Sequence, residues 1–188
     1  MKLKNLAKPN IKGIQFMSAP IRNSVKVILL NEKNELLLIS ADDPKTTSVD
    51  GKYHGKFWFL VGGEIEADES IEKAAIREIL EESGIKEDQI DLGPVVWVGE
   101  FDLVLDGTLT HLKQTFIVAK TKQNRVSFAN LTTWETRSFQ ALKWFSIDQI
   151  KNSKEIIYPV GLAEYLKDII AEKYPKKPIN IDLSKKPN

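Results

Sequence analysis

Residues 63 to 85 read GEIEADESIEKAAIREILEESGI, and they set spaced Gly, Glu and Arg residues into one loop and one helix. From residue 70 to residue 83 it contains no Pro or Gly and is rich in good helix formers, so it predicts an α-helix. Asp68 precedes this run as the expected N-cap, and Gly84 follows it as the expected helix stop. On a 3.6-residue period the apolar positions form one stripe that we expect to be buried: Ile71, Ala75, Ile79 and Leu80.

The same helix carries a cluster of acidic side chains. Glu78, Glu81 and Glu82 are spaced i, i+3 and i+4, so their side chains meet on one face. Like charges at this spacing destabilise a helix by about 0.2–0.5 kcal/mol per pair. A divalent cation would turn this repulsion into ligation, because hard cations prefer oxygen ligands. Taken alone, the run also fits a solvated acidic face on a surface helix.

The full set of spaced residues resembles the signature of the Nudix hydrolases. The resemblance implies an α/β fold, a Nudix-type α/β/α sandwich with a mixed β-sheet, and it extends more loosely over about residues 25–166. It also implies a metal-dependent pyrophosphohydrolase that cleaves a diphosphate linkage in a nucleoside diphosphate derivative, with Mg²⁺ or Mn²⁺ as the cofactor. Many family members have Pro before the double glycine, where this chain has Val61. The positions that agree with the signature are Gly63, Glu69, Arg77, Glu78, Ile79, Glu81, Glu82, Gly84 and Ile85.

The resemblance assigns metal ligands within this stretch. Glu78, Glu81 and Glu82 are expected to bind the metal ion, and the backbone carbonyl of Gly62 is expected as a further ligand. Glu78 is also a candidate general base, although a later loop supplies the base in some families with this signature.

Other charged residues are expected to complete the site. Glu69 and Arg77 are expected to serve catalysis by fixing the geometry of the loop and the helix, although Arg77 also fits a plain i,i+4 salt bridge. A carboxylate from outside the helix is expected near the metal. Glu135, in the loop before a strand at residues 141–145, is the best-placed candidate and Glu100 is the second. Either could instead be an ordinary exposed glutamate.

The sequence gives weaker signals for the residues that bind the substrate than for the metal ligands. Residues 41–56 are expected to form a polar loop, whose lysines could meet phosphates or simply lie at the surface: Lys45, Lys52 and Lys56. Several aromatic residues could stack on a nucleobase or pack in the core: Tyr53, Phe57, Trp58, Phe101 and Trp134. The two histidines, His54 and His111, lack ligand spacing and are expected to carry no chemistry.

The rest of the chain predicts a mixed α/β domain. Strands are expected at residues 25–30, 35–39, 57–61, 94–105, 110–120 and 141–145. A capping box at Ser146 and Gln149 predicts a short helix, and residues 160–173 predict an amphipathic one. We expect an N-terminal arm at residues 1–22, a Nudix hydrolase domain at 23–173 and a frayed C-terminal tail at 174–188.

Composition agrees with one compact enzyme domain. The 188-residue chain has a net charge of +1, so charge offers no strong evidence for nucleic-acid or membrane binding. It has no Cys, which excludes disulfides and thiolate chemistry. With no apolar signal segment or membrane span, we expect a cytoplasmic protein. The expected partner is a small-molecule nucleotide substrate, and a homodimer is left open.

Two other functions stay open at this point. A Nudix-fold module that binds or senses nucleotides without turnover has little reason to keep all these glutamates. An isomerase of the isopentenyl diphosphate type would require a catalytic cysteine, which the chain lacks. Nucleoside triphosphates, dinucleoside polyphosphates, nucleotide sugars and capped RNA 5′ ends all fit the motif as substrates.

Overall fold

A computed structural model describes residues 19–50 and 55–186 of the chain. Its centre is a mixed sheet with the strand order β3-β5-β6-β1-β2-β4, to which β7 adds beside β2 and β8 adds beside β5. The strands are β1 (Ile21–Leu30), β2 (Leu36–Asp42), β3 (Thr46–Ser48), β4 (Lys56–Leu60), β5 (Ile90–Leu105), β6 (Thr108–Thr121), β7 (Phe139–Phe145) and β8 (Ile179–Asn180). The helices are α1 (Ile71–Ser83), the 3₁₀ turn η1 (Glu87–Gln89), α2 (Thr133–Ser138), α3 (Ile147–Lys151) and α4 (Leu162–Ile170).

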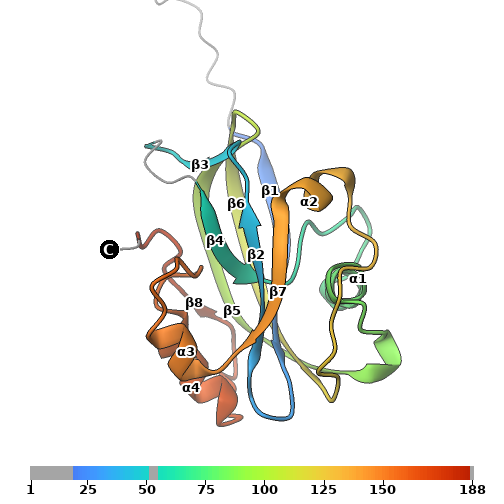
Figure 1. The fold of residues 1–188 in the computed structure, drawn as a ribbon. Coiled ribbons are helices and arrows are strands. Elements are labelled where there is room, and N and C mark those ends of the chain that lie inside the picture. The colour runs from blue at the N-terminus through green and yellow to red at the C-terminus, as the bar shows by residue number, and fades with distance from the viewer. Residues whose placement is uncertain (1–18, 51–54, 187–188) are drawn as a thin grey trace, which may run out of the picture.

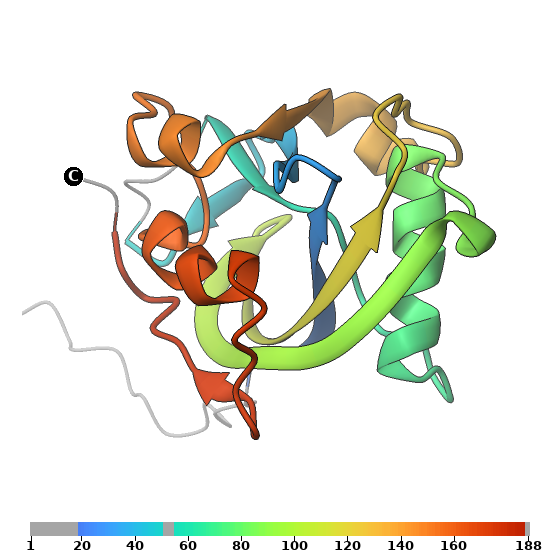
Figure 2. The same cartoon turned by 90° about the horizontal axis from the view of Figure 1, so that it is seen from below.

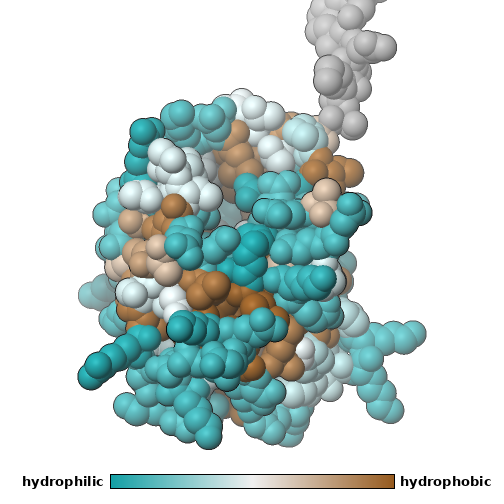
Figure 3. Space-filling view, turned by 90° about the vertical axis from the view of Figure 1, so that its right-hand side faces the viewer, coloured by the Kyte–Doolittle hydropathy of each residue, from teal (hydrophilic) through white to brown (hydrophobic). Residues whose placement is uncertain are grey.

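Helices cover both faces of this sheet, as Figures 1 and 2 show, with α1 on one side and the α3–α4 pair on the other. Successive residues of a strand point to opposite faces, and β1 follows this rule. Val25 and Val27 join the core under α1, whereas Ile28 and Leu30 join the core under α4. The predicted α/β/α sandwich with a mixed sheet is therefore confirmed. The side of the molecule shown in Figure 3 is largely hydrophilic, with a smaller apolar area in its middle.

The ends of α1 follow from local chemistry. Ser70 is the N-cap, and its hydroxyl accepts a hydrogen bond from the Lys73 N–H at 3.3 Å. The prediction of Asp68 as the N-cap was wrong, because the chain turns there with a φ of 63°. Gly84 ends the helix in the left-handed region at a φ of 73°, as predicted.

Two segments expected to be loops contain regular structure. Within residues 41–56, β2 continues to Asp42 and β3 pairs antiparallel with β5. Between them Asp43 is buried, and its carboxylate accepts hydrogen bonds from the Lys45 N–H and the Thr46 hydroxyl. The loop expected around Glu135 contains α2, which begins with a reciprocal capping box between Thr132 and Glu135.

The C-terminal segment packs on the sheet, so the prediction that it frays was wrong. β8 pairs parallel with β5, and the Ile181 N–H donates to the Val98 carbonyl at 2.8 Å. Ile181 is only 4% exposed. A side chain at Gly99 would begin 2.7 Å from Leu183, so the bare backbone of Gly99 makes room for this segment.

At the other end, β1 begins at Ile21, inside the expected arm. The three domain boundaries otherwise remain predictions. Across residues 19–50 and 55–186, every helix is too short or too polar to span a membrane.

Candidate active site

The double glycine after β4 brings the chain close to α1. Gly62 has a φ of 125°, and a Cβ there would lie 2.2 Å from the Val25 carbonyl oxygen. A Cβ at Gly63 would lie 2.5 Å from an oxygen of the Glu78 carboxylate. The Gly62 N–H donates to Glu82 Oε2 at 2.6 Å. Glycine is needed at both positions because backbone and carboxylates approach one another here without room for a side chain.

Three carboxylates meet beside this turn. Oxygens of Glu78, Glu82 and Glu135 all lie within 4.8 Å of one another. Glu78 and Glu82 come from α1 and are 4% and 1% exposed, whereas Glu135 comes from α2. The Glu135 Oε2 atom accepts hydrogen bonds from the Thr132 N–H at 2.7 Å and from its hydroxyl at 2.8 Å. The capping box of α2 therefore holds Glu135 against the helix that carries the other two carboxylates.

Arg77 fixes the loop before α1 to the acidic face of the helix. Its Nε and Nη2 atoms each donate to Glu69 at 2.9 Å, and Nη2 also donates to the Glu64 carbonyl at 2.9 Å. Nη1 donates to Glu78 at 2.7 Å and to Glu81 at 3.3 Å. The i,i+4 salt bridge therefore exists, but it is one part of a larger network that orients Glu78. Glu81 lies outside the three-carboxylate cluster, so its role as a metal ligand stays a prediction.

Burial makes it unfavourable for the carboxylates of the cluster to carry their negative charges. Burial raises the pKa of Glu82 to about 8, although Lys26 opposes this shift. Burial also raises the pKa of Glu78, against the opposing effect of Arg77. Buried carboxylates of this kind are stabilised by a nearby cation. Hard oxygen donors within a few ångströms suit Mg²⁺ or Mn²⁺, so the residues fit the expected metal ion.

Lys26 is a second cation in the site besides Arg77, and the sequence analysis missed it. Its Nζ atom donates a hydrogen bond to the Gly62 carbonyl, the oxygen predicted as a metal ligand. The ammonium also lies 5.1 Å from the centre of the Phe59 ring. Burial lowers the pKa of Lys26, while Glu82 and Glu78 act in the opposite direction. A lysine inside the apolar run VKVILL was the available signal.

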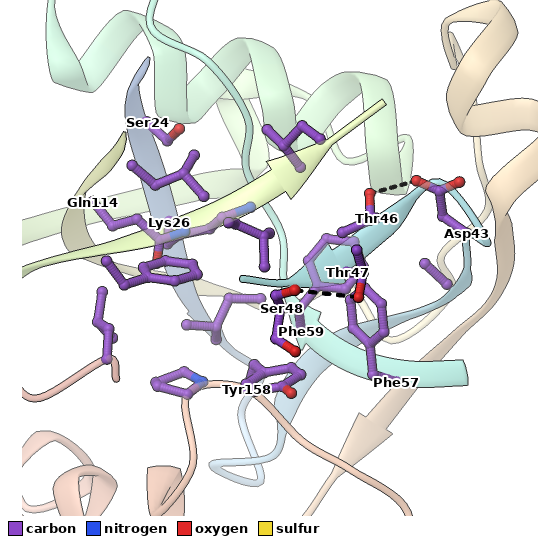
Figure 4. Close-up of a pocket in the computed structure, with 18 of the residues that line it drawn as sticks. Ser24, Lys26, Asp43, Thr46, Thr47, Ser48, Phe57, Phe59, Gln114 and Tyr158 are labelled. Atoms are coloured by element: carbon purple, nitrogen blue, oxygen red, sulfur yellow. Dashed lines mark hydrogen bonds between the residues drawn. The ribbon is translucent and has the colours of Figure 1, made fainter. Parts of the chain in front are cut away.

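A cavity of about 780 Å³ opens beside the cluster. Figure 4 shows Ser24 and Lys26 reaching it from β1, and Phe57 and Phe59 from β4. Tyr158 forms another part of the wall, and its ring lies edge-on to Phe57 with 5.6 Å between centres. The C-terminal segment also lines the cavity, through residues 183–186. The sequence predicted neither Tyr158 nor residues 183–186 as part of the cavity wall.

The aromatic residues predicted as nucleobase contacts fall in different places. Phe57, Phe101 and Trp134 line the cavity. Trp58 is 5% exposed and packs edge-on against Phe145 at 4.9 Å, so the structure places it in the core. Tyr53 lies outside the described residues, as do His54 and Lys52.

The remaining candidates lie at ion pairs outside the cluster. Glu100 lines the cavity, but its carboxylate lies 3.4 Å from His111 Nε2 and does not belong to the three-carboxylate cluster. His111 also contacts Asp102 at 2.7 Å. Lys45 pairs with Asp106 at 2.8 Å, and Lys56 pairs with Glu155 at 3.4 Å.

The sequence of most of the chain matches one known family. The NUDIX domain family model matches residues 20–164. A protein of Bacillus subtilis (strain 168) with the name "Putative 8-oxo-dGTP diphosphatase" is 41% identical over 58 residues. That match covers 31% of this chain and 32% of the relative, so the chain spans about a third of the length of this curated relative.

Solved structures share the fold. The MutT protein of Methanosarcina mazei Go1 has a TM-score of 0.56 at 23% identity, over 86% of this chain and 99% of that one. The dihydroneopterin triphosphate pyrophosphohydrolase of E. coli has a TM-score of 0.57 at 16% identity, over 81% and 99% of the two chains. The family model covers most of the described residues, including the glycine turn, α1 and α2, and so the chain belongs to the Nudix hydrolase family.

Proposed function

We propose that this protein is a divalent-metal-dependent pyrophosphohydrolase that cleaves a diphosphate linkage in a nucleotide or nucleotide-linked substrate. The observation that carries the proposal is the cluster of Glu78, Glu82 and Glu135, two of which, Glu82 and Glu135, line a large cavity. These three carboxylates, together with the Gly62 carbonyl, are the proposed ligands of Mg²⁺ or Mn²⁺. Glu81 is a further candidate at the edge of the set.

A diphosphate carries several negative charges and repels an attacking water. The bound metal would neutralise that charge, lower the pKa of the water and align the attacking and leaving oxygens. The protein supplies the positions of the ligands. The Gly62 N–H holds Glu82, Arg77 holds Glu78, and the α2 capping box holds Glu135.

Arg77 and Glu69 contribute to catalysis by positioning other groups in this proposal. Glu69 fixes the guanidinium with two 2.9 Å hydrogen bonds, and the guanidinium then orients Glu78. Glu78 is the first candidate for the general base, because Arg77 holds its carboxylate in place within the cluster.

The cavity suits a nucleotide in size and lining. Its volume of about 780 Å³ falls in the range of small-molecule sites. Phe57, Phe59 and Tyr158 supply aromatic surface for a base or another flat group. The relatives compared above carry names that refer to different triphosphates, so we assign the substrate only as a nucleotide derivative. A cytoplasmic location and a homodimer remain predictions.

A substrate panel with and without metal tests the proposal. It contains nucleoside triphosphates, dinucleoside polyphosphates, nucleotide sugars and capped RNA, each assayed with Mg²⁺, with Mn²⁺ and with EDTA. We expect at least one substrate to be cleaved only when metal is present, and Glu82→Gln to abolish that cleavage. The absence of turnover above EDTA across the panel would overturn the proposal. Nucleotide binding without turnover, measured by calorimetry, would identify the non-catalytic binding module instead.

A further inference from the structure

We propose that Lys26 is a built-in counter-cation of the site: it holds the Gly62 carbonyl oxygen in the metal-free protein, and a divalent ion displaces it from there toward a phosphate of the substrate. This inference rests on the proposed function, because it takes the Gly62 carbonyl as a metal ligand. It adds a positioning residue that the sequence motif does not contain.

Lys26 lies on a strand whose surroundings disfavour a charged side chain. Its neighbours Val25 and Val27 are fully buried, and the strand pairs with β6 along its length. A lysine is an expensive residue at such a place unless its charge is compensated. The compensation comes from the Gly62 carbonyl and the Phe59 ring, and the carboxyl groups of Glu82 and Glu78 lie nearby. The ammonium therefore occupies part of the space in which a cation is favoured.

Lys26 and a metal ion would compete for the same carbonyl oxygen. The Nζ atom of Lys26 donates its hydrogen bond to the Gly62 carbonyl. A divalent ion bound to the same oxygen and to Glu82 would lie next to the ammonium, and the two positive charges repel each other. Binding of the metal at that oxygen therefore requires the ammonium to move away.

The cavity offers a place for the displaced ammonium. The side chain of Lys26 extends from β1 toward the cavity, where Ser24 and Gln114 form part of the wall (Figure 4). Ser24 and Gln114 are register partners on β1 and β6, so they lie side by side. An ammonium on a flexible four-carbon stem can turn into this region without backbone movement. A diphosphate bound beside the cluster would present its negative charge to the same region.

Manganese binding to the substrate-free protein tests the first half of the proposal. Lys26→Met keeps most of the apolar stem against Phe59 and removes the ammonium. We expect Lys26→Met to bind Mn²⁺ at least about threefold more tightly than the wild type, by electron paramagnetic resonance or calorimetry. Arg22→Gln is the matched control, because Arg22 also lines the cavity but pairs with Glu64 at 3.3 Å. It removes one positive charge without freeing the Gly62 carbonyl, so its Mn²⁺ affinity should change by less than about twofold.

Inorganic pyrophosphate tests the second half. With Mn²⁺ saturating, we expect Lys26→Met to bind pyrophosphate about tenfold more weakly than the wild type, since one charge-assisted hydrogen bond is lost. A crystal structure of the wild-type protein with Mg²⁺ gives a direct readout, and it also decides the matter if the Lys26 variant does not fold. We expect the Nζ atom to have left the Gly62 carbonyl.

The outcomes separate this inference from the proposed function. A wild-type protein that binds no Mn²⁺ would overturn the proposed metal site itself. If the wild type binds Mn²⁺ and both Lys26→Met and Arg22→Gln bind it with the same affinity as the wild type, the role of Lys26 alone is overturned. Retention of the hydrogen bond from Lys26 to Gly62 in the Mg²⁺ complex would have the same meaning.

Discussion

Glu82 is expected to destabilise the metal-free protein, because folding buries its carboxylate beside two others. In the folded state the pKa of Glu82 is raised to about 8, against an ordinary value of 4.5. One pKa unit corresponds to about 1.4 kcal/mol, so at pH 7 the folded protein loses on the order of 3 kcal/mol by keeping this group protonated while the unfolded chain releases the proton. Glu82→Gln removes this loss and keeps an oxygen to accept the Gly62 N–H bond.

The sign of the pH dependence follows from linkage. Because the pKa is higher in the folded state, the folded protein binds more protons than the unfolded chain between pH 4.5 and pH 8. Burial of Glu82 therefore costs no stability below pH 4.5, where the carboxyl group is protonated in both states, and the cost grows as the pH rises toward 8. The gain from Glu82→Gln should be on the order of 3 kcal/mol at pH 7 and less than about 1 kcal/mol at pH 5.

Urea denaturation in EDTA at both pH values measures this difference, and Glu81→Gln is the matched control. Glu81 lies on the same helix with its side chain 31% exposed, so its substitution should change stability little at either pH. With Mn²⁺ present the order should reverse, since the wild type gains binding energy that Glu82→Gln has lost. A Glu82→Gln protein that is destabilised equally at pH 5 and pH 7 would show that burial of this carboxyl group does not cost the folded protein stability.

Three further predictions concern the ligand set, the glycine turn and the C-terminal segment. Glu78→Gln should lower turnover about 100-fold and flatten the acidic limb of the pH–rate profile. Glu135→Gln should lower turnover at least about tenfold, since both carboxylates belong to the cluster. A Glu135 variant that keeps both the rate and the profile would show that this residue takes no part in catalysis. Gly63→Ala should weaken Mn²⁺ binding in a calorimetric titration, because the new Cβ would lie 2.5 Å from the Glu78 carboxylate, and unchanged affinity would show that this carboxylate can shift freely. Ile181→Asp should lower the free energy of unfolding by about 2–4 kcal/mol, whereas Ile179→Asp, at a 53% exposed position of the same segment, should have little effect; equal effects would argue against packing of the tail.

Features that depend on neighbouring residues could be predicted from the sequence. The α1 helix, its end at Gly84 and the acidic face follow from residues within a few turns of one another, where spacing alone decides which side chains meet. The capping box at Ser146 was predicted for the same reason. The α/β/α class followed from the resemblance, and the strand cores followed from apolar runs.

Features that depend on distant parts of the chain became visible only in the folded structure. Glu135 lies 53 to 57 residues beyond the helical carboxylates in sequence, and only the packing of α2 brings its oxygens within 4.8 Å of theirs. Lys26 is the single polar residue in the apolar run of residues 25–30, and its partner is a backbone carbonyl 36 residues away that no side-chain pattern marks. The tail has little apolar surface of its own, and it is ordered because β5 offers unpaired backbone groups and Gly99 leaves space for Leu183. Local patterns do not record such contacts, because their free energy arises only when the sheet has formed.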